Sequence, residues 1–158
     1  MVHTYANANE QKLSKVHPRV KDLALSFLAD VDVDVMITHG LRTFAEQAAL
    51  YAKGRTAAGK IVTYAQAGRS YHNYGLAIDF VPLNLKKQAI WNTSDERWER
   101  AIKVAEAKGF ESGARWEKLK DYPHLQLTFG LSTKQLAAMY ATADRSITRL
   151  WNELNNLT

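Results

Sequence analysis

Two stretches of the chain place histidine and aspartate at short spacing. The first is Ser70-Tyr71-His72-Asn73-Tyr74-Gly75-Leu76-Ala77-Ile78-Asp79, in which His72 and Asp79 are seven residues apart. Side chains an odd number of residues apart on one straight strand point to opposite faces, so these two converge only if the chain bends between them. Gly75 supplies that bend, because glycine has the widest backbone freedom.

Asp79 stands in an apolar neighbourhood. It is flanked by Ile78 and Phe80 in the run LAIDFV of residues 76–81, which predicts a buried strand. A carboxylate in the middle of such a strand is costly unless it is paired or bound to a metal ion. Asp79 is therefore a candidate metal ligand.

The second stretch is Asp121-Tyr122-Pro123-His124, which leads into the run HLQLTF of residues 124–129. The alternation of polar and apolar residues predicts a strand whose polar face, with His124, lines a cleft beside Asp79. Pro123 argues against a helix at this point, so Asp121 is expected on the loop before the strand.

Two imidazoles and one carboxylate are a ligand set typical of hydrolytic zinc sites. Three protein ligands leave the fourth position of the metal open, whereas structural zinc sites fill all four. Such an ion polarises a carbonyl group and lowers the pKa of water toward neutrality. A separate carboxylate must then move the proton, and Asp121 is the candidate for this general base. Arg42 is a candidate for holding a substrate carboxylate or an oxyanion, with a surface salt bridge as the alternative.

The composition restricts other kinds of site. The 158 residues include no cysteine, which excludes disulfides, thiolate zinc sites and a cysteine nucleophile. The net charge of +5 favours anionic partners, but the cationic residues form no basic run, so nucleic-acid binding is a weak alternative. No apolar stretch is long enough to span a membrane, and the N-terminal residues lack the apolar core of a signal peptide.

The hydrophobic pattern predicts an α+β fold, with a small mixed or antiparallel sheet, helices packed on it and the zinc site in a cleft on the sheet. Strands are expected at residues 31–38, 76–81 and 124–129. Helices are expected from Pro18, from Thr43 to about Lys53, from about Ser94 to Lys108, from Ser132 or Thr133, and over the apolar residues between 147 and 157. Residues 1–12 are expected to be loose, and residues 55–70 to form a loop with at most one short strand.

The length suits a single domain over residues 1–158. Within it we expect a catalytic core at about residues 13–130 and a helical C-terminal segment at residues 131–158. Two interpretations of this segment stay open: a helix packed on the core, or a surface helix that touches cell wall or membrane.

The motif S-x-H-x-x-G-x-A-x-D at Ser70–Asp79, followed by D-x-P-H at Asp121–His124, resembles that of the VanY-like zinc peptidases. This superfamily contains D-alanyl-D-alanine carboxypeptidases and the L-alanyl-D-glutamate endopeptidases of phage endolysins and bacterial autolysins. The similarity to the endopeptidases extends to Val16-His17-Pro18, to Gly40-Leu41-Arg42-Thr43 and to Gln47. Asp at position 121 favours that branch, since the carboxypeptidases usually have Glu as the base.

The resemblance implies one zinc ion per chain, bound by His72, Asp79 and His124. It implies that Asp121 is the catalytic base and that Arg42 also takes part in catalysis. The substrate-binding residues that it implies are Ser70, Arg42 and Gln47.

The implied activity is hydrolysis of the L-alanyl-D-glutamate bond of peptidoglycan stem peptides by a phage endolysin. We expect such a protein to be a monomer that binds peptidoglycan, not nucleic acid, and inserts stably into no membrane. Without a signal peptide, it is expected in the host cytoplasm until it is released to the cell wall. The alternatives are a D-alanyl-D-alanine carboxypeptidase and a non-catalytic, zinc-bearing module that binds the cell wall.

Two residues near these motifs have open roles. His39 is close to Arg42 in the sequence; a position in the cleft is one alternative, and a position behind the ligands or at the surface is the expected one. Trp116 lines the cleft or belongs to the core.

Overall fold

The computed structural model describes residues 1–157, so Thr158, the last residue of the predicted C-terminal segment, lies outside the described part. The elements follow in the order α1 (Ala6–Leu13), α2 (Pro18–Asp30), β1 (Val35–His39), α3 (Phe44–Ala52), η1 (Tyr71–Tyr74), β2 (Ala77–Pro82), α4 (Glu96–Lys108), β3 (Glu111–Ser112), η2 (Gly113–Arg115), β4 (His124–Gln126), α5 (Thr133–Thr142) and α6 (Ile147–Asn155).

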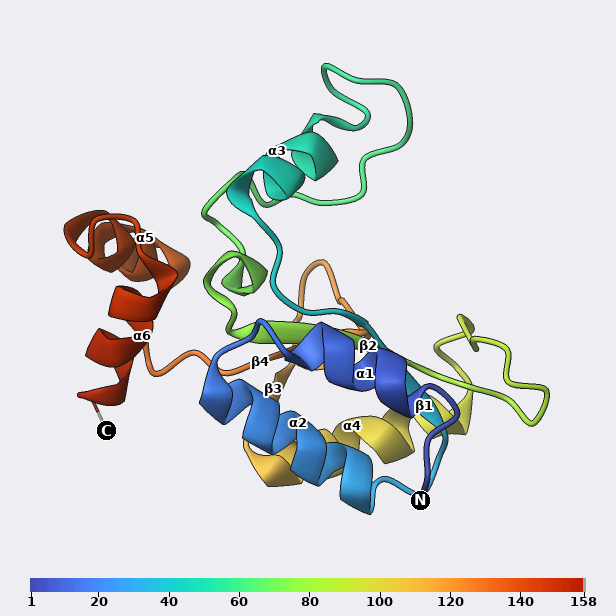
Figure 1. The fold of residues 1–158 in the computed structure, drawn as a ribbon. Coiled ribbons are helices and arrows are strands. Elements are labelled where there is room, and N and C mark those ends of the chain that lie inside the picture. Colours follow the sequence, from blue (N-terminus) through green and yellow to red (C-terminus); the bar gives the residue numbers. More distant parts are fainter. Residues whose placement is uncertain (158) are drawn as a thin grey trace.

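The four strands form one sheet in the order β1-β2-β4-β3, and all neighbours are antiparallel. In Figure 1, helices α2 and α4 lie below the sheet and α1 crosses in front of it, whereas α3 and the long loop after it project above it. The pair α5 and α6 lies to one side. The predicted α+β fold with a small antiparallel sheet is confirmed.

The main core lies between the sheet and helices α2 and α4. The Phe80 ring of β2 sits 5.5 Å from the Phe27 ring of α2 and 5.3 Å from the Trp98 ring of α4, and all three side chains are buried. Successive residues of a strand point to opposite faces. The packing of Phe80 into this core therefore turns the neighbouring Asp79 to the other face of the sheet.

The helices predicted from local signals are present. Pro18 is the first residue of α2, and the side chain of His17 caps that helix by accepting from the Arg19 N–H. Thr43 and Glu46 form the predicted capping box of α3. Ser132 caps α5, and α4 ends at Gly109. Such caps satisfy backbone groups that a helix end leaves without partners, which is why they mark helix ends reliably.

The prediction that residues 1–12 are loose is wrong, because they contain helix α1. This helix has little apolar character, and tertiary contacts hold it in place. The buried Asn9 side chain accepts from the Ile37 N–H at 2.8 Å and donates to the Val35 carbonyl at 3.5 Å. Strand β1 is at the edge of the sheet. The Asn9 side chain forms the hydrogen bonds that a neighbouring strand would form there, and so covers that edge.

The strands differ from the prediction in extent and in number. Strand β1 begins at Val35 instead of residue 31, and β4 ends at Gln126 instead of residue 129. The short strand β3 has no counterpart in the sequence analysis. Residues 55–70 contain no strand, only the end of an isolated bridge between Lys53 and Ala57. None of the helices described within residues 1–157 has both the length and the apolar character needed to cross a bilayer.

Candidate metal and active site

The three predicted metal ligands converge on one face of the sheet. His72 lies on η1, Asp79 in the middle of β2 and His124 at the start of β4. Asp79 and His124 are directly paired in the β2–β4 register, and Gly75 makes the bend with a φ of 68°. One donor atom from each ligand lies within 4.8 Å of the other two, a spacing at which one ion can contact all three.

The outer nitrogen of each imidazole is held by a fixed partner. His72 Nδ1 lies 2.9 Å from the Gly40 carbonyl oxygen, and His124 Nε2 lies 2.7 Å from Gln126 Oε1. Both partners are acceptors in this arrangement, so the outer nitrogens donate. The inner nitrogens, His72 Nε2 and His124 Nδ1, then face Asp79 Oδ1 at 3.0 and 3.6 Å. Fixing the outer nitrogen in this way orients an imidazole for metal binding.

The electrostatics of the cluster also suit a cation. Burial opposes ionisation of Asp79, but the imidazoles of His72 and His124 outweigh it and hold the pKa of the carboxyl well below its usual range. Burial likewise opposes the charged form of His124, but its hydrogen bond to Asp79 raises the pKa of this imidazole. The half-buried Asp79 carboxylate thus draws positive charge to the space between the three donors. Two imidazoles and one carboxylate are a donor set that fits zinc.

Arg42 and Gln47 form a pair next to Asp79. The Arg42 guanidinium donates to Gln47 Oε1 at 3.0 Å and approaches Asp79 Oδ2 at 3.9 Å. Gln47 is fully buried, and its amide nitrogen donates to the Ala65 carbonyl at 2.8 Å. Arg42 lines the cleft, while Gln47 lies behind it and fixes its direction. Direct binding of substrate by Gln47 stays a prediction.

Ser70 stands at the start of the turn that bears His72. Its hydroxyl accepts from the His72 N–H at 3.3 Å, and its own N–H donates to Asn73 Oδ1 at 3.3 Å, which completes a capping box. The Asn73 amide also donates to the Arg42 carbonyl at 3.1 Å. Ser70 lines the cleft as well, and its contact with substrate stays a prediction beside this structural role.

Asp121 lies on the loop before β4, as predicted, and its side chain lines the same cleft. Although the residue is exposed to solvent, the surrounding cleft walls desolvate its carboxyl group, and this raises its pKa. The charge of Asp79 adds to the rise. Its backbone N–H donates to the Gly113 carbonyl at 3.0 Å. A carboxylate with a raised pKa, held beside a metal site, is suited to accept and release a proton.

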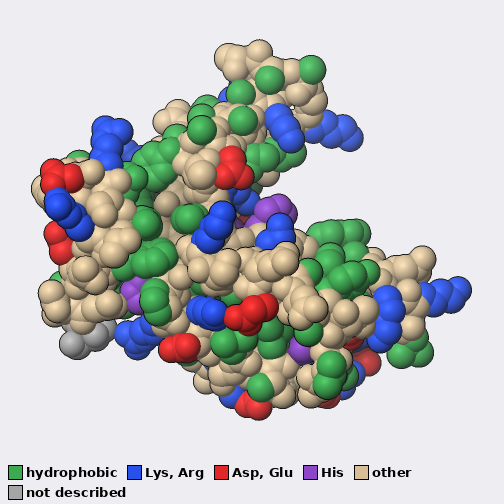
Figure 2. All heavy atoms as spheres, in the orientation of Figure 1, with side chains coloured by type: hydrophobic (Ala, Val, Ile, Leu, Met, Phe, Trp, Pro, Cys, Tyr) green, Lys and Arg blue, Asp and Glu red, His purple; other side chains and the backbone are tan. Residues whose placement is uncertain are grey.

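The cleft has a volume of about 970 Å³. Its wall includes Trp116, whose ring lies 5.2 Å from that of His124, and residues of the projecting loop after α3. In Figure 2, histidine and cationic side chains lie at the base of the hollow below this loop. Three cations line the cleft, Arg42, Arg69 and Lys120.

His39 is exposed at the surface, as expected, and it also lines the cleft, which was the alternative. A register shift between Ile37 and His39 interrupts the β1–β2 pairing next to the site. The His39 side chain, 59% exposed, places Nδ1 3.5 Å from Asp79 Oδ2. Bulges of this kind redirect side chains beside functional sites. The alternating sequence of β1 contains no sign of such a shift.

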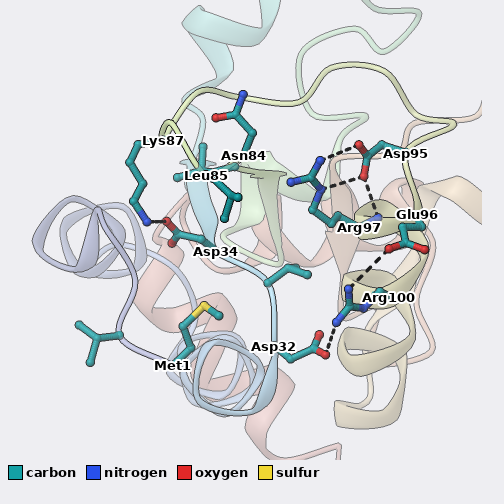
Figure 3. Close-up of a pocket in the computed structure, with 13 residues that line it drawn as sticks. Met1, Asp32, Asp34, Asn84, Leu85, Lys87, Asp95, Glu96, Arg97 and Arg100 are labelled. Atoms are coloured by element: carbon teal, nitrogen blue, oxygen red, sulfur yellow. Dashed lines mark hydrogen bonds and ion pairs between the residues drawn. The ribbon is translucent and has the colours of Figure 1, made fainter.

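A second hollow, of about 660 Å³, lies at the opposite end of the β1–β2 pair, where Val35 faces Pro82. Figure 3 shows that its charged side chains are paired with one another: Lys87 with Asp34, Arg97 with Asp95, and Arg100 with Asp32 and Glu96. Because these charges neutralise one another, this hollow offers no converging donors comparable to those around Asp79.

Comparison with known proteins places these motifs in a family. A family model described as D-alanyl-D-alanine carboxypeptidase matches residues 63–127. The peptidoglycan L-alanyl-D-glutamate endopeptidase CwlK of Bacillus subtilis is 44% identical over 124 residues, which cover 72% of this chain and 74% of CwlK. The L-alanyl-D-glutamate peptidase of a Listeria phage is 28% identical over 141 residues, which are 88% of this chain but only 47% of the phage protein.

Two solved structures share the fold. The Serratia marcescens L-Ala D-Glu endopeptidase ChiX superposes with a TM-score of 0.63 at 24% identity, over 79% of this chain and 90% of ChiX. The LD-carboxypeptidase LdcB superposes with a TM-score of 0.54 at 16% identity, over 87% of this chain and 68% of LdcB. The identity to CwlK, over most of both chains, and the matched family model agree with the motif around His72, Asp79 and His124. The chain therefore belongs to the VanY-like peptidase family.

Proposed function

We propose that this protein is a zinc-dependent endopeptidase that hydrolyses the L-alanyl-D-glutamate bond of peptidoglycan stem peptides. The observation that carries the proposal is the convergence of His72, Asp79 and His124 on one point of a cleft that also holds the carboxyl group of Asp121. The activity printed for CwlK and for the phage relative supports the choice of bond.

The side chains around the ligands divide the reaction between them. A zinc ion held by the three ligands supplies Lewis acidity toward the scissile carbonyl and the attacking water. Asp121 takes a proton from that water as its oxygen adds to the carbonyl carbon. Asp121 then passes the proton to the amine of D-glutamate as the C–N bond breaks, which leaves L-alanine with a new carboxylate. The Arg42 guanidinium, aimed into the cleft by Gln47, stabilises the oxyanion.

The charge of the cleft supports an anionic peptide as substrate. Among the described residues that line it, the cations are Arg42, Arg69 and Lys120, and the carboxylates are Asp79, which is held by the imidazoles, and Asp121. Stem peptides cut at D-glutamate contain free carboxylates, which such a cleft attracts.

We further propose one zinc ion per chain, a monomeric protein, and a role in lysis of a host cell by a phage. The phage relative supports the lytic role, although this chain spans about half of that relative's length. In this role the protein would stay in the host cytoplasm until it gains access to the wall.

The decisive experiment is mass analysis of purified peptidoglycan after digestion, with and without a chelator. We expect digestion to release fragments with a new amino group on D-glutamate. No such fragments should form in the presence of the chelator, and they should form again when zinc is added back. Release of D-alanine alone would favour the carboxypeptidase. Zinc binding by metal analysis without any new fragment would favour the non-catalytic wall-binding module.

A further inference from the structure

We propose that the C-terminal helical pair, α5 and α6, positions the turn that presents His72 to the metal. The inference rests on the metal site of the proposed function but not on the bond that is cut. It assigns Trp151 and Tyr71 as positioning residues, which act on the metal through the backbone of η1. The motif of the family ends before this segment, and no pattern in residues 131–157 indicates such a role.

The first contact joins α6 to the end of the turn. Trp151 Nε1 donates to the Tyr74 carbonyl at 2.8 Å, two residues after His72. The Trp151 ring also covers Gly75, where an added Cβ would come within 2.7 Å of the ring. The bend that brings His72 toward Asp79 is thus packed directly beneath an indole ring from the far end of the chain.

The second contact joins the segment before α5 to the start of the turn. The Tyr71 hydroxyl donates to the Leu131 carbonyl at 2.5 Å. From α5 itself, the Tyr140 ring lies 5.9 Å from the ring of the fully buried Tyr74. Residues on both sides of His72 are therefore held by the C-terminal segment, while the Gly40 carbonyl holds its imidazole.

A buried histidine ties α6 to the same bend. His17 Nδ1 accepts from the Arg19 N–H, so its Nε2 bears the proton and donates to Asn155 Oδ1 at 2.9 Å. The His17 N–H donates to the Gly75 carbonyl at 2.9 Å. The His17 ring also stacks edge-on against Trp151, with the centroids 5.5 Å apart. One residue thus contacts both the bend and the helix that covers it.

Through these contacts the C-terminal segment fixes the turn that bears His72, in addition to packing on the core. A ligand that is free to move must be ordered when the metal binds, and this ordering weakens binding. A turn that is already fixed at both ends loses little conformational entropy when the metal binds, so binding is tighter. Residues that orient metal ligands from outside typically change metal affinity by about 10- to 100-fold when mutated.

The test uses the full chain with Trp151→Phe, which keeps the aromatic ring but removes the N–H. Trp91→Phe is the matched control, because Trp91 is 61% exposed. Zinc affinity is measured by competition with a chromophoric chelator, and the melting temperature of the metal-free protein is measured by circular dichroism. We expect a roughly tenfold loss of zinc affinity for Trp151→Phe and none for Trp91→Phe.

Tyr71→Phe, with Tyr5→Phe as its control, provides the same comparison at the other end of the turn. It tests the inference by itself if Trp151→Phe does not fold. A lower melting temperature with zinc affinity within about twofold of wild type in the folded variants would show a purely structural role and overturn the inference. If wild-type protein binds zinc but leaves peptidoglycan intact, the proposed function fails while this comparison still holds.

Discussion

Gly113 and Asp121 are in direct backbone contact at the rim of the cleft. The Asp121 N–H donates to the Gly113 carbonyl at 3.0 Å, and a Cβ on Gly113 would lie 2.3 Å from the Asp121 carbonyl oxygen. Only glycine fits at this distance without a shift of the backbone. The position of the candidate base is therefore set by a residue that is itself neither charged nor polar in its side chain.

We expect Gly113→Ala to displace Asp121 and to lower kcat/KM by roughly 10- to 100-fold, since small misplacements of a catalytic group have effects of this size. Zinc affinity should fall less than kcat/KM, because the displaced Asp121 carbonyl touches the ligand set through the His124 N–H, at 3.3 Å, and not through a side chain that binds the metal. Steady-state kinetics and a zinc titration on the same preparation check the two expectations. Unchanged kcat/KM would mean that Asp121 does not act from its observed place.

Asp121→Asn should remove the proton acceptor while keeping the size of the side chain. We expect hydrolysis to fall by roughly 10²- to 10⁴-fold, with zinc still bound. Fragment release from peptidoglycan and metal content by mass spectrometry are the two measurements. Glu117→Gln, a nearby carboxylate that does not line the cleft, is a suitable control. An active Asp121→Asn variant would remove this residue from the mechanism.

The cations on the cleft walls should recognise the carboxylates of the substrate. Arg69→Gln and Lys120→Gln should each raise KM for a free-acid stem peptide by roughly 5- to 10-fold, as expected for the loss of one charge-assisted hydrogen bond, with little change in kcat. For a peptide amidated at the α-carboxyl of D-glutamate, the variants should differ less from wild type. Lys118→Gln, outside the cleft lining, is the matched control. An equal effect on both peptides would contradict charge recognition.

Asp34, which lies far from the cleft, should make the free energy of unfolding depend on pH. Burial raises its pKa, but hydrogen bonds from Thr4 and the charge of Lys87 outweigh burial, so the folded protein holds the pKa below the ordinary value. A lowered pKa means that the ionised form stabilises the fold above the ordinary carboxyl pKa. This contribution is lost as the pH falls through the pKa of the folded state.

We therefore expect Asp34→Asn to lower the free energy of unfolding at pH 7 by about 1 kcal/mol, with the difference from wild type vanishing at strongly acidic pH. Urea unfolding across the pH range measures this. The control is Asp32→Asn, which breaks the exposed pair with Arg100 and should cost less than about 0.5 kcal/mol. A difference that persists at the lowest pH would show that the ionised form is not the cause.

The meeting of the candidate ligands His72, Asp79 and His124 on one face was predictable from local signals. Asp79 interrupts an apolar strand, Pro123 keeps Asp121 off a helix, and Gly75 permits the bend. The strand alternation then puts Asp79 and His124 on one face, where the register pairs them directly. The helix caps at Thr43 and Ser132 are equally local and were predicted for the same reason.

The features that escaped prediction depend on contacts between distant parts of the chain. Helix α1 is polar and is held by Asn9 at the edge of β1, so no periodicity reveals it. Gln47 has the sequence position expected of a substrate ligand, but only the fold shows that it lies behind Arg42. The hydrogen bond from Trp151 to Tyr74 joins residues 77 positions apart. Neither spacing nor composition encodes such a pair.

The pairing of the strands leads to a further consequence. His39, Asp79 and His124 occupy one row across β1, β2 and β4, since Asp79 is the register partner of both histidines. A slip of one strand by a single residue would turn its side chain to the opposite face. The strand register therefore also sets the geometry of the site, because strands paired out of register could not bring these three side chains to the same face.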